Sequence, residues 1–145
     1  MLKLTTSIGI KAESKTVWEI LKDTKRYGEW NPFIKSIDGE MNIGSKIRVF
    51  LQPFGSKGMM IRPRLLEFSE DEGIRWMGRL GIPYLFDGEH SFKIIKNPDN
   101  TVIFFQEELF RGLLVPFFKK SLNTGTKKGF EEMNRALKAR SEKGR

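Results

Sequence analysis

Residues 86–110 read FDGEHSFKIIKNPDNTVIFFQEELF, and this stretch decides the fold. Apolar and polar residues alternate through its first ten positions, which is typical of a strand with one buried face. The NPDN in its middle has turn chemistry: Pro98 suits the second position of a type I turn, and Asn100 tolerates the left-handed conformation that follows it. The stretch therefore predicts a β-hairpin in which Asn97 pairs with Thr101.

This pairing predicts which polar groups face each other across the hairpin. It places His90 opposite Glu108 and Phe92 opposite Gln106, all on the inward face. His90, the only histidine of the chain, thus shares an otherwise apolar face with a carboxylate and an amide. Leaving such groups buried without partners costs roughly 1–3 kcal/mol each. Three explanations remain open: a structural network, the polar end of a ligand cavity, or a pair that transfers protons.

The other periodicities predict an α+β domain with one apolar sheet face. A strand and two short helices come first, and several further strands lead into the hairpin. Six or seven antiparallel strands of this kind need a cover, which a long C-terminal helix with Pro116 in its first turn supplies. Pro63 removes one ladder bond, so its strand is expected to be bulged or at an edge there. The predicted strands before the hairpin span 2–11, 45–52, 58–68 and 73–80.

Two glycines interrupt the predicted long helix. Gly125 and Gly129 lie one turn apart, near the apolar stripe that contains Leu122 and Met133. Each glycine costs a helix roughly 1 kcal/mol relative to alanine. Two interpretations remain open, because missing side chains allow either close packing of the helix on the sheet or space for a bound molecule.

Composition limits the classes of function. The 145 residues suit one domain, 1–145, and contain one histidine and no cysteine, so no metal is expected. No glycine-rich phosphate loop precedes a helix, so no cofactor is expected either. The N-terminus lacks the apolar run of a signal peptide and no stretch is long enough to span a membrane, which predicts a cytoplasmic protein. The oligomeric state is not predicted.

The basic charge is concentrated at the C-terminal end. The net charge is +8, and residues 119–145 hold nine basic and three acidic residues, which gives +6. Basic motifs interleaved with aromatic residues are missing, so no nucleic-acid partner is expected. The charge predicts either a solvated helix face with a frayed tail at about 141–145, or a weak contact with an acidic surface.

Several segments resemble the SRPBCC superfamily, also called START-like, in its bacterial polyketide cyclase/dehydrase-related branch. The similarity covers about residues 4–140, and its most specific part is WNPF at 30–33. The resemblance implies a helix-grip fold, in which a curved antiparallel sheet wraps a long C-terminal helix around a hydrophobic tunnel. It also implies binding of lipids, sterols or polyketides, or catalysis of cyclisation or dehydration. The similar segments are VWEILKDTKRYGEWNPFI, GEMNIGSKIRVFLQP, IRWMGRLGIPYLFDGEHSF, QEELFRGLLVPFF and GFEEMNRALKAR.

Position in this fold predicts the residues that line the tunnel. They are Trp30, Phe33, Leu51, Ile61, Trp76, Phe86, His90, Phe92, Phe104, Gln106, Glu108, Phe110, Phe118, Leu122 and Gly125. Trp30 and Phe33 have a second interpretation, because they can simply plug the end of the core beside the short helices.

The favoured hypothesis is a non-enzymatic protein that binds a small, mostly hydrophobic molecule. His90 and Gln106 are expected to meet a polar group of that molecule, while Glu108 orients the imidazole. The alternative is a cyclase, dehydratase or isomerase that uses His90 as general base. A third hypothesis is a module that docks on a protein or membrane through its basic C-terminal helix.

Overall fold

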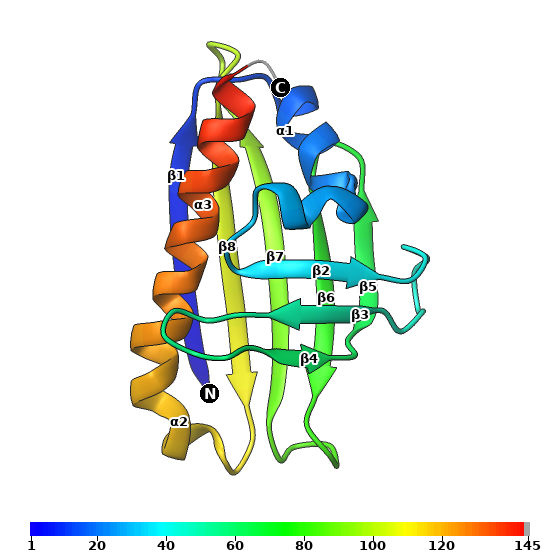
Figure 1. Ribbon diagram of the computed structural model, residues 1–145, viewed down its shortest axis with the longest axis vertical. Helices are drawn as coiled ribbons and strands as arrows, with labels where there is room; N and C mark the ends of the chain where they lie inside the picture. The colour runs from blue at the N-terminus through cyan, green and yellow to red at the C-terminus, as the bar shows by residue number, and fades with distance from the viewer. Residues whose placement is uncertain (144–145) are drawn as a thin grey trace.

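The computed structural model describes residues 1–143 and is α+β, with eight strands and one long interrupted helix (Figure 1). The first half contains β1 (Leu2–Ile10), α1 (Ser14–Lys22), the 3₁₀ helix η1 (Thr24–Glu29), β2 (Ile34–Asp38), β3 (Arg48–Leu51) and β4 (Met59–Ile61). The second half contains β5 (Arg64–Ser69), β6 (Gly73–Arg79), β7 (Asp87–Lys96), β8 (Val102–Arg111), α2 (Val115–Ser121), the π-helical segment η2 (Leu122–Thr126) and α3 (Lys127–Glu142).

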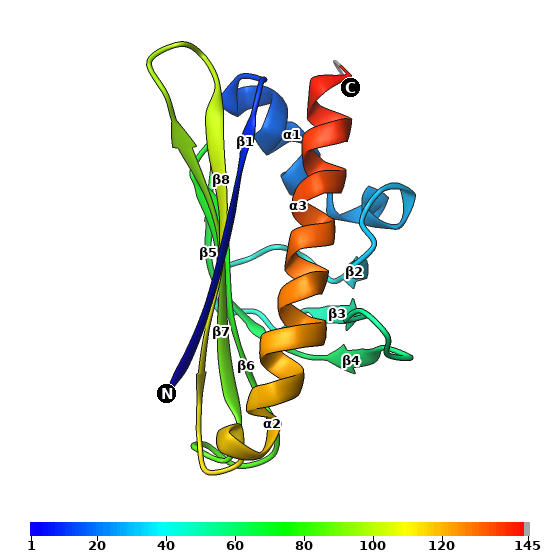
Figure 2. The same ribbon diagram turned by 90° about the vertical axis from the view of Figure 1, so that its left-hand side faces the viewer.

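The strands form two antiparallel sheets. The large sheet has the order β1-β8-β7-β6-β5, and the small sheet has the order β2-β3-β4. The small sheet and α3 lie side by side over the same face of the large sheet (Figures 1 and 2). The α+β helix-grip class predicted from the sequence is therefore confirmed, whereas the prediction of one sheet with six or seven strands is wrong.

Pro63 explains part of this difference. The stretch 58–68, predicted as one bulged strand, is divided by Arg62 and Pro63 into β4, which pairs with β3, and β5, which pairs with β6. Proline has no backbone N–H to donate, so a ladder cannot continue through it. An isolated bridge between Lys46 and Arg64 links the two sheets at this point.

The hairpin of β7 and β8 has the predicted register. His90 lies opposite Glu108 and Phe92 lies opposite Gln106. The backbone N–H of Asn97 donates to the carbonyl oxygen of Thr101 over 2.9 Å. The turn chemistry of NPDN thus determines which side chains meet on the inner face of the large sheet.

The two glycines of the covering helix are sites of close packing. A Cβ on Gly129 would lie 2.5 Å from the Phe33 ring, and one on Gly125 would lie 3.0 Å from the carbonyl oxygen of Phe54. The backbone N–H of Phe54 also donates to the carbonyl oxygen of Gly125 over 3.2 Å. The packing interpretation is therefore confirmed at Gly129, whereas Gly125 packs on Phe54 and also lines a surface hollow.

The C-terminal end of α3 is attached to the first corner of the chain. Ser141 is buried, and the carboxylate of Glu142 accepts hydrogen bonds from the backbone N–H of Lys11 (2.8 Å) and from Nζ of Lys138 (2.7 Å). The prediction of a frayed tail from residue 141 is therefore wrong for 141 and 142, where buried and hydrogen-bonded groups fix the helix. Positions 144 and 145 of that prediction lie outside the described residues.

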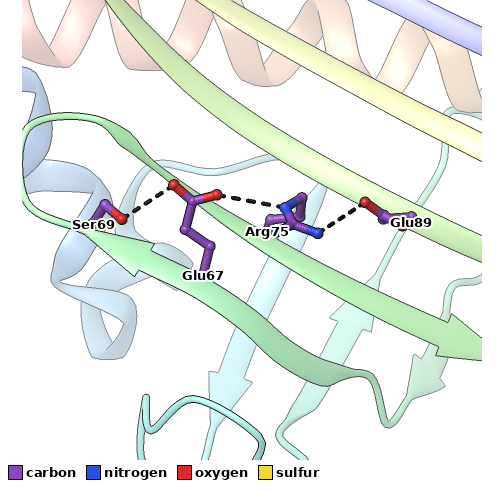
Figure 3. Close-up of polar contacts among 4 residues, drawn as sticks. All are labelled: Glu67, Ser69, Arg75 and Glu89. Carbon is purple, nitrogen blue, oxygen red and sulfur yellow. Dashed lines mark hydrogen bonds and ion pairs between the residues drawn. The ribbon is translucent and has the colours of Figure 1, made fainter.

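The outer face of the large sheet carries ion pairs between strands (Figure 3). Arg75 on β6 lies between Glu67 of β5, at 3.5 Å, and Glu89 of β7, at 3.0 Å, and Ser69 donates to Glu67 over 3.1 Å. Such partly exposed pairs contribute about 0–1 kcal/mol each. This face is polar and partly solvated, so the candidate site lies on the opposite, inner face. Among residues 1–143, no helix combines the length and apolar character needed to cross a membrane.

Candidate functional site

A chain of hydrogen bonds crosses the core from the large sheet to α3. Nε2 of His90 lies 3.0 Å from Oε1 of Gln106. The amide nitrogen of Gln106 donates to the carbonyl oxygen of Phe130 (3.0 Å) and to Oδ1 of Asn134 (2.8 Å). Asn134 in turn donates to Oγ1 of Thr6 over 3.0 Å. All of these contacts are buried, so β1, β7, β8 and α3 are joined by one polar network.

The direction of these hydrogen bonds determines the protonation of His90. The carbonyl of Phe130 can only accept, which orients the Gln106 amide nitrogen toward α3 and its oxygen toward His90. Nε2 of the imidazole must therefore carry a hydrogen. The other ring nitrogen, Nδ1, lies 3.2 Å from Oε1 of Glu108, so the imidazole lies between an amide and a carboxylate.

Aromatic rings surround the imidazole. Its centroid lies 4.5 Å from that of Phe92, 4.8 Å from Phe130, 5.7 Å from Trp76 and 6.4 Å from Phe33. The His90 side chain is 2% exposed, whereas the Glu108 side chain is 16% exposed. Glu108 is therefore the end of the network that a small molecule can reach.

Partly exposed apolar side chains gather toward the same end of the inner face. We call this region the α2-end site, formed by Phe86, Glu108 and Phe118. The Phe86 and Phe118 rings meet edge to face with their centroids 5.5 Å apart, and Phe86 also lies 5.8 Å from the ring of Phe110. Phe86 packs against the core without being fully buried, and Phe118 is 44% exposed. The region thus combines an accessible apolar surface with one carboxylate.

Two glycines shape the sheet beside Glu108. The position that a Cβ of Gly88 would take is occupied by the Glu108 carboxylate, so the missing side chain accommodates this group. Gly78 lies opposite Gly88 on β6 and is different. The nearest atom to a Cβ added at Gly78 would be Cβ of Pro63, 3.9 Å away. The inner face therefore has open space above Gly78.

The sequence-predicted site residues fall into three groups. Trp30, Leu51, Ile61, Phe86, Glu108 and Gly125 are partly exposed, and Phe118 is exposed. Gly125 lies away from the polar network, against Phe54. The fully buried group consists of Phe33, Trp76, His90, Phe92, Phe104, Gln106, Phe110 and Leu122.

The WNPF segment stabilises the chain reversal before β2. Oδ1 of Asn31 accepts hydrogen bonds from the backbone N–H groups of Phe33 (2.9 Å) and Ile34 (2.8 Å). Trp30 packs on Tyr27 with ring centroids 5.2 Å apart, and Phe33 packs edge to face on Phe130 at 5.3 Å. These contacts favour the interpretation that Trp30 and Phe33 plug the core.

Sequence reasoning missed three members of the network: Thr6, Phe130 and Asn134. Thr6 alternates with Leu4 on the inner face of β1, and Asn134 follows Met133 of the apolar helix stripe. A polar residue within an apolar pattern could have indicated a buried hydrogen bond at both positions. The pairing of β1 with β8 was not available, because no short turn joins these strands.

Two surface hollows lie outside the α2-end site. One lies beside η2 between Phe54, Thr124 and Lys128, where the Lys128 ammonium is 4.5 Å from the centroid of the Phe54 ring. The other lies on the outer sheet face and includes Ser91 and Phe105. Neither contains a member of the buried network, and Gly125 is the one predicted ligand-site residue that lines the first hollow.

Comparison with known proteins identifies relatives of the whole chain. Residues 1–142 match the family model described as "Polyketide cyclase / dehydrase and lipid transport". No curated protein matches the chain. A START superfamily protein from Mycobacterium smegmatis superposes with a TM-score of 0.72 at 20% identity, over 99% of both chains.

Two further solved structures share this fold. A Streptomyces aromatase/cyclase has a TM-score of 0.75 at 13% identity, over 98% of this chain and 94% of its own. A Mesorhizobium loti protein has a TM-score of 0.76 at 14% identity, over 99% of both chains. At such low identities, these superpositions show a common fold only. The family match, in contrast, covers nearly the whole sequence. The chain therefore belongs to the polyketide cyclase / dehydrase and lipid transport family.

Proposed function

We propose that the protein binds a small, mostly hydrophobic molecule at the α2-end site. The observation that carries this proposal is the combination of partly exposed Phe86 and Phe118 rings with one accessible carboxylate, that of Glu108. Pockets for small molecules are typically apolar with a few convergent polar groups. The description of the family, which includes lipid transport, supports a ligand of this class.

The polar group of the ligand would meet Glu108. His90 and Gln106 are buried and have partners inside the protein, which argues against the expected direct contact with a ligand. A carboxylate accepts hydrogen bonds, so the matching group is a donor such as a hydroxyl or an amine. The imidazole behind Glu108, 3.2 Å away, would hold this carboxylate in one orientation.

One observation favours an enzymatic alternative. Glu108 is accessible and lies 3.2 Å from an imidazole nitrogen, an arrangement suited to proton transfer in a cyclase, dehydratase or isomerase. In that case Glu108, rather than the buried His90, would contact the substrate. His90 would act as a positioning residue that supplies or holds the proton.

The third hypothesis, docking through the basic C-terminal end, has less support. Lys138 pairs with Glu142 at 2.7 Å and Arg140 pairs with Glu29 at 2.8 Å. Two basic side chains of this end are therefore already engaged within the protein.

Filling the open space above Gly78 tests the proposed site. Gly78→Leu is expected to keep the fold and to abolish binding of the apolar fluorophore N-phenyl-1-naphthylamine. Gly9→Leu is the matched control, because the Cβ position of Gly9 on β1 is likewise open, with no atom within 4 Å, but Gly9 alternates onto the opposite sheet face. Equal fluorophore binding by both variants and the unaltered protein would contradict the location of the site.

Native mass spectrometry of the purified protein addresses the ligand itself. We expect an added mass that corresponds to a small molecule with at least one hydroxyl or amine group, and we expect Gly78→Leu to lose it. Glu108→Gln separates the two candidate functions. A binding protein would keep apolar probes and lose selectivity for donor groups, whereas an enzyme would lose roughly 10²–10⁴-fold in rate with substrate binding retained.

A further inference from the structure

Exposed apolar side chains are concentrated at one end of the molecule. The β6–β7 loop and the segment from β8 into α2 meet there, at the bottom of Figures 1 and 2. We call this end the tip, formed by Leu80, Ile82, Tyr84, Leu113 and Phe117. Phe117 is 81% exposed and Leu113 is 78% exposed. Exposed apolar residues scattered singly need no explanation, but a contiguous group marks an interaction surface.

The tip is held in place by backbone hydrogen bonds. The N–H of Leu113 donates to the carbonyl oxygen of Tyr84 over 3.1 Å, and the N–H of Leu114 donates to that of Leu85 over 3.0 Å. Tyr84 has a φ of 68°, a left-handed conformation that is uncommon for an aromatic residue. Its N–H donates to the carboxylate of Asp87 over 3.2 Å. The two loops thus form one connected platform that presents apolar side chains to solvent.

The surroundings of the tip are basic. The stretch 109–122 contains three basic residues and no acidic residue. Lys119 and Lys120 extend from α2 directly after Phe117 and Phe118, and Arg111 ends β8. The β6–β7 connection, 80–86, has no acidic residue, and Asp87 at the start of β7 is 6% exposed and lies 3.7 Å from Arg79. The tip therefore presents apolar side chains beside positive charge that nearby carboxylates do not balance.

We propose that this tip docks on the surface of an anionic lipid bilayer. Aromatic and aliphatic side chains enter the boundary between headgroups and acyl chains, while lysine and arginine side chains nearby attract the negative surface. The charge complementarity favours an anionic membrane over an uncharged one. The inference stands independently of the proposed ligand site, although Phe118 connects the two regions through its contact with Phe86.

Co-sedimentation with vesicles tests the proposal. The full chain is expected to bind vesicles of phosphatidylglycerol mixed equally with phosphatidylcholine, and to bind phosphatidylcholine alone much more weakly. Reversing both charges with Lys119→Glu and Lys120→Glu should weaken this binding at least about tenfold, and added salt should weaken it as well. Leu113→Ser with Phe117→Ser should also weaken it strongly. All four side chains are exposed, so thermal melting should change little.

Matched controls exclude general effects of charge and hydrophobicity. Lys15→Glu with Lys25→Glu makes the same change in net charge on α1 and η1, far from the tip in Figure 1. Ile43→Ser removes an exposed apolar side chain from the β2–β3 loop. Both controls should bind vesicles as the unaltered protein does. Failure of the unaltered protein to bind anionic vesicles, or equal weakening by controls and tip variants, would overturn the proposal.

Discussion

Nδ1 of His90 lies 3.2 Å from Oε1 of Glu108, the residue directly opposite it on β8. The other ring nitrogen faces the side-chain oxygen of Gln106, so both nitrogens face acceptors. The only histidine of the chain is therefore held between the carboxylate of Glu108 and the amide of Gln106, within a cage of aromatic rings.

Glu108→Gln should change the protonation of this ring. The substitution keeps the shape of the side chain and removes the negative charge 3.2 Å from Nδ1, a charge that favours a proton on the ring. The ¹⁵N resonance of Nδ1 should move toward the value of an unprotonated nitrogen, while that of Nε2 stays protonated. Unchanged ring resonances would show that Glu108 does not determine the charge of His90.

The sequence alone predicted that His90 and Glu108 face each other, but it did not predict the partners of Gln106 on α3. The turn at 97–100 has residues that favour one loop geometry, and local geometry transmits the register along both strands to His90 and Glu108. The partners of Gln106 lie 24 and 28 positions away on α3. Their contact depends on how the helix is placed over the sheet, which no local pattern determines.

The division into two sheets was missed for a similar reason. β4 has three residues and β2 has five, so their alternation is too short to separate them from neighbouring loops. The contact of Phe33 with Gly129 likewise joins residues far apart in the sequence. The sequence singled out Gly129 as a glycine inside the predicted helix and Phe33 as part of WNPF. It did not show that the Phe33 ring occupies the space that Gly129 leaves.

The buried network should contribute to stability according to the number of partners lost. Gln106→Leu leaves the Phe130 carbonyl, Asn134 and His90 without their partner, and each unsatisfied group costs roughly 1–3 kcal/mol. We expect a loss of about 3 kcal/mol or more in the free energy of unfolding. Thr6→Val removes a single acceptor and should cost about 1 kcal/mol. Urea denaturation measures both values, and equal losses would contradict a network centred on Gln106.

The C-terminal end of α3 should confer a dependence of stability on pH. Hydrogen bonds from the Lys138 ammonium and from the Lys11 backbone lower the pKa of Glu142. A carboxylate with a lowered folded-state pKa stabilises the protein above its unfolded-state pKa, and this contribution is lost as pH falls through the folded-state pKa. Glu142→Gln should therefore lower the melting temperature at neutral pH and have little effect in acid. A difference that did not vary with pH would argue against the charge of Glu142 as its source.

The contact between Phe33 and Gly129 can be tested with a double-mutant cycle. Gly129→Ala places a methyl group 2.5 Å from the Phe33 ring, and overpacking of this kind costs about 1–3 kcal/mol. Alanine also favours the helix by about 1 kcal/mol, so the net loss in unfolding free energy should be about 0–2 kcal/mol.

In a Phe33→Leu background the clash is relieved, and Gly129→Ala should become neutral or stabilising by up to about 1 kcal/mol. The coupling between the two positions, measured by urea denaturation of all four proteins, should therefore equal the relieved overpacking, about 1–3 kcal/mol. Additive effects would mean that α3 shifts to accept the methyl group. In that case Gly129 would be present for a reason other than close approach to Phe33.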